Sequence, residues 1–144
     1  MAKFCNTLNN IKKVEVIEAR HLKNINIIHG VGVLLNYWRN FIEIPITDLA
    51  EVEMASNIEN KSRLITTKLT FHTSTHFYVD NRPLCFRVTS INGSQWLIGT
   101  DVHPFAVVNT TDRYPSNVTD KSGCTVVAEY KNTHGMLAIL DKYR

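Results

Sequence analysis

Two histidines four positions apart are the residues whose spacing comes closest to a chemical site. His72 and His76 flank the tripeptide Thr-Ser-Thr. On a strand, side chains an even number of positions apart share a face, so both imidazoles could reach one metal ion. A zinc site needs three or four ligands. The remaining ligands would have to come from elsewhere in the fold, from His103, His134, Cys85 or Cys124. We favour the simpler interpretation of two histidines on a solvated strand face, and we predict no metal site.

The cysteines are the next candidates for reactivity. Cys85 and Cys124 lie in strand patterns, where a small apolar thiol packs well, whereas a reactive thiol prefers an exposed, electropositive setting. The short Gly-Val-Gly at 30–32 lacks the Lys-Ser/Thr of a phosphate-binding loop. Asp112 and Asp120 lie in a polar stretch that is typical of turns. We therefore predict no catalytic or cofactor-binding residue, no cofactor and no enzymatic activity.

Length and composition indicate one globular domain. The 144 residues are 44% apolar, which is enough for a single core. Sixteen Lys and Arg against thirteen Asp and Glu give a net charge of +3, and the longest cationic run is Lys12-Lys13. Sequence-specific binding to nucleic acid is therefore not expected. We expect a single domain spanning 1–144, in which residues 1–12 could form an N-terminal arm.

The cysteines and the apolar runs indicate in which compartment the protein is made and whether it contacts a membrane. Three cysteines without a CxxC motif predict neither a disulfide framework nor a zinc ribbon. The first residues lack the apolar segment of a signal peptide, and the longest apolar run covers only residues 136–140. That run is far too short to span a bilayer. We expect a protein without membrane contact that is made in a reducing cytoplasm.

The strongest local signal is a hairpin over residues 83–100. Leu84, Phe86 and Val88 alternate with polar or small residues, and the strand signal resumes at Gln95. Between them lies an Asn-Gly pair at 92–93, and these two residue types tolerate the positive φ of a tight hairpin turn. We therefore predict that this hairpin lies at the centre of a β-rich domain.

Other stretches also show the two-residue period of strands. In residues 63–73, Ile65, Thr67, Leu69 and Phe71 are expected on one face and His72 on the other. Further strands are expected over residues 14–19, 25–29, 105–108, 124–131 and 136–140. Seven or eight short strands with turns between them predict an all-β, mainly antiparallel sandwich or barrel.

Three segments are ambiguous or polar. Residues 30–46 fit both a helical stripe and a strand face, and two glycines with Pro45 favour strand or loop. Residues 47–57 open with a capping-box pattern, Asp48 to Glu51, and are the best candidate for one short helix. Residues 109–123 are expected to form a long polar loop, and loops of that length are commonly functional.

The C-terminal half resembles small virion proteins of tailed phages and prophages. Residues 83–109, PLCFRVTSINGSQWLIGTDVHPFAVVN, and residues 112–135, DRYPSNVTDKSGCTVVAEYKNTHG, carry the resemblance. They show a hairpin ending in Leu-Ile-Gly-Thr, a Pro-containing strand, a polar loop and a last strand with alternating small residues. The resemblance implies a non-enzymatic neck, tail or baseplate subunit that repeats around an axis, as a ring beside neighbouring virion proteins.

Three functions follow from these observations. The first is a structural subunit of a phage-type virion, acting through strand edges and the 109–123 loop. The second is a β-barrel module that binds a sugar or small ligand in a pocket lined by aromatics such as Trp38 or Trp96. The third is a metal-dependent enzyme built on His72 and His76. We favour the first.

Overall fold

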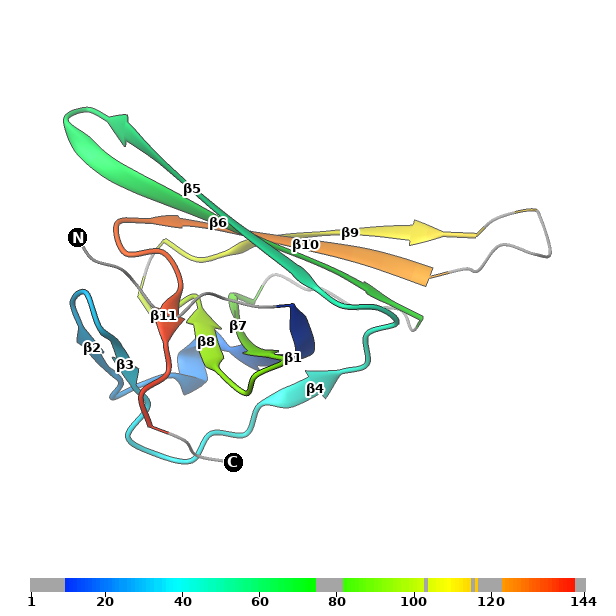
Figure 1. Ribbon diagram of the computed structural model, residues 1–144, viewed down its shortest axis with the longest axis horizontal. Coiled ribbons are helices and arrows are strands. Elements are labelled where there is room, and N and C mark those ends of the chain that lie inside the picture. Colours follow the sequence, from blue (N-terminus) through cyan, green and yellow to red (C-terminus); the bar gives the residue numbers. More distant parts are fainter. Residues whose placement is uncertain (1–9, 75–81, 103, 115, 117–122, 142–144) are drawn as a thin grey trace.

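The computed structural model describes residues 10–74, 82–102, 104–114, 116 and 123–141. Within them, nearly every regular element is a β-strand (Figure 1). One sheet contains five antiparallel strands in the order β11-β8-β7-β1-β4. Their bounds are Leu137–Ala138 for β11, Gln95–Ile98 for β8, Leu84–Ser90 for β7, Ile11–Glu18 for β1 and Ile42–Ile44 for β4.

A second sheet contains four antiparallel strands in the order β5-β6-β10-β9. Their bounds are Glu51–Glu59 for β5, Ser62–Thr73 for β6, Gly123–Asn132 for β10 and Val107–Arg113 for β9. A small hairpin of β2 (Asn26–Ile28) and β3 (Gly32–Leu34) completes the strands, and Ala19–His21 forms one turn of 3-10 helix. The predicted all-β, antiparallel class is confirmed, with the sheets arranged as a sandwich and not as a closed barrel.

The predicted hairpin over residues 83–100 is present as β7 and β8. Phe86 pairs with Ile98 and Val88 with Trp96. Gly93 has a φ of +95° in the connecting turn, a conformation that glycine adopts without steric cost. On its other side, β7 pairs with β1 from Ile11 to Glu18. The hairpin therefore supplies the middle strand of the five-stranded sheet.

The predicted faces of residues 63–73 are also confirmed. Leu69 and Phe71 are fully buried and Thr67 is buried beside them. Lys68 and His72 lie on the opposite, exposed face of β6. This alternation buries one face of the four-stranded sheet against the five-stranded sheet.

Both faces of the five-stranded sheet are covered. Phe86 and Val88 on one face of β7 belong to the core between the two sheets, where the Phe86 ring meets the Phe71 ring edge-on at 6.3 Å. Cys85 on the other face belongs to a second core with Leu97. Leu22, Val33 and Leu35 from the β2–β3 region close this second core. The chain thus forms three layers, and β7 is buried along almost its whole length.

Two predictions for the segment between β3 and β6 had different outcomes. The preference for strand or loop over residues 30–46 agrees with the short strands β3 and β4. The helix predicted over residues 47–57 is wrong, because β5 pairs with β6 through every residue from Glu51 to Glu59. Asp48 accepts a hydrogen bond from the neighbouring Leu49 amide, at 3.3 Å. Pairing with β6 therefore outweighs the local capping pattern.

The predicted loop over residues 109–123 is also wrong in its extent. Asn109 to Arg113 belong to β9 and pair with β10, in which Gly123 lies opposite Arg113. Residues 117–122 lie outside the described part of the chain. The strand predicted over residues 105–108 begins only at Val107. Of the proposed N-terminal arm, Ile11 and Lys12 lie in β1, and residues 1–9 are not described.

Candidate functional site

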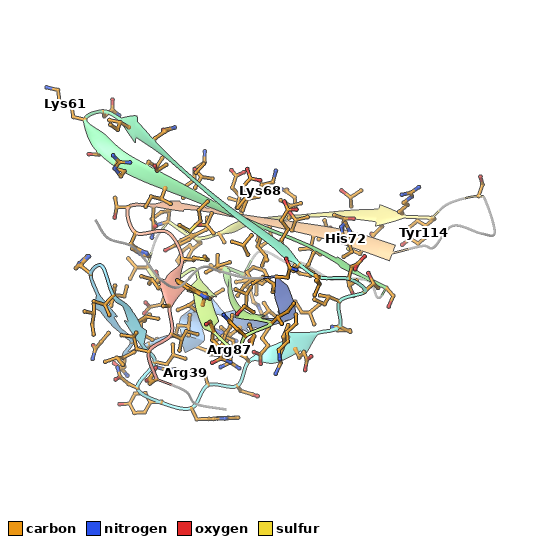
Figure 2. The ribbon with its side chains drawn as sticks, in the orientation of Figure 1. Arg39, Lys61, Lys68, His72, Arg87 and Tyr114 are labelled. Carbon is orange, nitrogen blue, oxygen red and sulfur yellow. The ribbon has the colours of Figure 1, made fainter. Side chains whose placement is uncertain are left out.

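The β5–β6 hairpin projects beyond the sandwich. Its tip extends past the other strands at one end of the four-stranded sheet (Figure 1), and Lys61 lies at that tip (Figure 2). All side chains described between residues 53 and 63 are exposed. Met54 is 47% and Ile58 is 68% exposed. Aliphatic side chains that face water add no stability to a two-stranded hairpin. Their presence here is typical of a surface that contacts another molecule.

The four-stranded sheet has open edges on both sides. β5 and β9 are its outer strands, and in the described part of the chain neither pairs with a further strand. Such edges expose backbone N–H and C=O groups that can accept another strand. Val107 on β9 is 61% exposed and Tyr114, just after β9, is 78% exposed. The exposed aliphatic residues and the open edges therefore occur on the same sheet.

A second exposed apolar region is the loop of residues 35–41, which we call the aromatic loop. Its Tyr37 and Trp38 side chains are 55% and 59% exposed. The Asp141 carboxylate accepts hydrogen bonds from the Leu35 and Asn36 amides, both at 2.8 Å. The backbone carrying these two rings is therefore held in place at its start.

Arg39 fixes the rest of the aromatic loop. Its guanidinium donates hydrogen bonds to the carbonyl oxygens of His21, at 3.3 Å, of Leu35, at 2.9 Å, and of Lys23. The guanidinium carbon also lies 5.2 Å from the centroid of the Tyr37 ring. The loop is thus ordered before it meets any partner, which lowers the entropic cost of binding.

A buried ion pair lies between β1 and β7, and the sequence analysis did not predict it. Glu15 and Arg87 are opposite each other in the register. Arg87 Nε donates to Glu15 Oε1 at 2.8 Å, and a terminal nitrogen donates to Oε2 at 2.7 Å. Both side chains are 7% exposed, and the Phe41 ring lies 4.1 Å from the guanidinium carbon. We interpret this bidentate pair as structural, because its charged atoms bind each other and are shielded from solvent.

The candidate metal ligands do not come together in the described residues. His72 is exposed on β6 (Figure 2). Its Nδ1 lies 2.9 Å from Thr125 Oγ1. His76 and His103 lie outside the described residues. Elsewhere in the described part of the chain, no three or more His, Cys, Asp or Glu side chains are placed to hold a metal ion.

The two described cysteines are core residues. Cys85 and Cys124 are buried, and no disulfide joins them. The Cys85 thiol donates to the Thr100 carbonyl at 3.4 Å. Burial, with a smaller contribution from the Asp101 charge, raises the pKa of Cys85 to about 12. A thiol with that pKa is almost entirely protonated near neutral pH, so Cys85 is a poor nucleophile.

Trp96 lies beside a groove between the β2–β3 turn and the turn that follows β10. His29, His134 and Met136 line the same groove. His134 Nδ1 lies 2.8 Å from the Gly135 carbonyl, to which only an N–H can donate. Its Nε2 therefore accepts the hydrogen bond from Asn132 Nδ2, at 2.5 Å. Trp38, the other aromatic residue proposed for a ligand pocket, lies on the aromatic loop instead.

His134 gives a prediction for the pH dependence of stability. Burial, and to a smaller extent the charge of His29, lowers the pKa of His134 below 6.5. As the pH falls through 6.5, His134 becomes protonated in the unfolded chain but stays neutral in the folded chain. Acidification therefore destabilises the fold. We expect the free energy of unfolding to fall below pH 6.5, and to fall less steeply in His134→Asn. Urea titrations between about pH 5 and 8 measure both slopes. Equal slopes would contradict the prediction.

Comparison with known proteins gives no relative: no family model, curated protein or solved structure matches the chain. No helix in the described residues is both long and apolar enough to cross a membrane. The fold and its exposed surfaces thus define an antiparallel β-sandwich with a projecting hairpin and a rigid aromatic loop.

Proposed function

We propose that this chain is a non-enzymatic structural subunit of a phage-type virion, such as a head–tail connector, tail or baseplate component. It acts through repeated contacts with copies of itself, arranged as a ring, and with neighbouring virion proteins. It is assembled into the particle in the host cytoplasm. No residue has a catalytic role in this proposal.

The observation that carries the proposal is the projecting β5–β6 hairpin on a sheet with open edges. Ile58 is 68% exposed near its tip, and β5 has no outer partner strand among the described residues. Isolated exposed aliphatics are common, but a projecting edge strand that carries them is a template for contact with another chain. The resemblance of residues 83–140 to virion proteins supplies the phage context.

Self-association should therefore depend on Ile58. We expect Ile58→Lys to weaken self-association by about tenfold or more, because a charge then replaces an aliphatic side chain at a desolvated contact. Sedimentation velocity over a concentration series measures the effect. Val102→Lys is the matched control, since Val102 is 64% exposed but lies in the turn after β8. It should associate like the parent.

A parent chain that stays monomeric over the whole concentration range would contradict the proposal. So would an Ile58→Lys variant that associates as strongly as the parent. The sugar or small-ligand module stays a prediction, with Trp96 beside its groove, as does the metal enzyme built on His72 and His76.

A further inference from the structure

A hollow lies where the segment before β5 meets the β7–β8 turn. Its volume is about 570 Å³, and Leu49, Val52 and Ile91 supply apolar walls. Leu49 is 47% and Ile91 is 53% exposed. Among the described residues that line it, Glu51 is the charged one. We call this feature the acidic hollow.

The surroundings of the hollow are also acidic. Asp48 precedes Leu49, and Glu53 follows Glu51 along β5, where it lies opposite Lys68 in the register; all three carboxylates are exposed. The acidic hollow therefore combines exposed aliphatic walls with a negatively charged margin. An occupant that fits it has an apolar ring or chain surrounded by cationic groups.

The aromatic loop has this complementary composition. Trp38 is 59% exposed at its centre. The loop is hydrogen-bonded to the backbone of residues 21–24, through Arg39 and through Asn36 Nδ2, which donates to the Asn24 carbonyl at 2.6 Å. Exposed Arg20, His21 and Lys23 belong to this neighbouring segment. Glu18, on the same segment, is engaged by Arg20 and Arg82, and Asp141 is engaged by the loop.

We infer that Trp38 of one copy inserts into the acidic hollow of the next copy. This inference rests on the proposed self-assembly and names one of its contacts. A rigidly held tryptophan that enters an apolar hollow is a common form of interface hot spot. The basic segment beside the loop then faces the acidic margin of the hollow.

The positions of the two surfaces decide the type of assembly. The aromatic loop connects β3 to β4 along the lower margin of the molecule, whereas β5 begins on another side (Figure 1). The hollow is lined by the first residues of β5. Because the loop and the hollow lie on different sides, two copies are not expected to exchange both contacts reciprocally, and each copy uses its loop toward one neighbour and its hollow toward another. Such a contact produces a ring or an open filament.

Mixing two variants, one that lacks a functional loop and one that lacks a functional hollow, tests whether the loop of one copy binds the hollow of another. Trp38→Asp removes the inserted side chain but keeps the hollow, and Leu49→Asp disables the hollow but keeps the loop. Each variant alone should associate at least about thirtyfold more weakly than the parent. An equimolar mixture should form a 1:1 dimer and stop there, because only one functional loop and one functional hollow can meet. Sedimentation velocity and mass photometry measure the stoichiometry.

Three controls keep the result interpretable. Far-UV circular dichroism and urea unfolding should match the parent, since both substituted side chains are about half exposed. Val102→Asp should associate like the parent. Raising salt from about 50 to 500 mM should weaken the association of the parent, because opposite charges meet at the margin of the hollow.

The possible outcomes distinguish a failure of this contact from a failure of the proposed function. If the parent associates and Trp38→Asp associates equally well, the contact is wrong while self-assembly stands. If the mixture stays monomeric, the loop and the hollow do not pair. A parent that is monomeric over the whole concentration range overturns the contact and self-assembly together.

Discussion

Arg87→Met is expected to lower the free energy of unfolding by about 3–5 kcal/mol, because it leaves the Glu15 carboxylate buried without its bidentate partner. The two hydrogen bonds of 2.8 and 2.7 Å are lost together. Lys13 Nζ lies 3.9 Å from the same carboxylate but is on a side chain that is 40% exposed, so it replaces little of the loss. Urea unfolding followed by circular dichroism measures the change.

Two further variants show whether burial causes this effect. Arg82→Met removes an arginine that donates to Glu18 at 2.8 Å but is 62% exposed, and it should lower stability much less than Arg87→Met does. The double variant Glu15→Leu/Arg87→Met should recover most of the loss, because no uncompensated charge remains buried. Equal costs for Arg87→Met and Arg82→Met would show that the buried position of the pair is unimportant.

Gly32→Ala is expected to cost about 1–3 kcal/mol through overpacking. A Cβ at this position would lie 2.2 Å from the carbonyl oxygen of Ala138, which is backbone and cannot rotate away. The clash would separate β3 from β11 and break the 2.9 Å hydrogen bond from the Leu140 amide to the Val33 carbonyl. Global stability and hydrogen exchange at the Leu140 amide measure the loss.

Gly30→Ala is the matched control for steric contact. Gly30 has a φ of +77°, and a Cβ there would meet no atom within 4 Å. Its substitution introduces only conformational strain, about 1 kcal/mol, and should leave the Leu140 amide protected. If Gly32→Ala loses no more protection at Leu140 than Gly30→Ala, the close approach of β3 to β11 is not needed for stability.

The candidate surfaces could be predicted from the sequence only in part. Tyr37 and Trp38 are visible in the sequence as an aromatic pair in an ambiguous segment. Their exposure depends on Asp141, which holds the loop from 106 positions away, and on Arg39, which ties the loop to the backbone of residues 21–23. Likewise, the Glu15–Arg87 pair joins residues 72 positions apart. No local pattern reports such a contact, because it exists only once β1 and β7 lie side by side.

The sequence by itself determined the elements whose own residues carry a complete local signal. The β7–β8 hairpin has both strands and its Asn-Gly turn in one stretch, and the two faces of β6 follow from simple alternation. The tertiary structure alone decided that residues 47–57 contribute a strand and that residues 109–113 extend β9. A strand is completed by hydrogen bonds to another strand, so its formation depends on which neighbour the fold provides. The three layers, the open edges and the acidic hollow arise for the same reason: each joins segments that the sequence keeps apart.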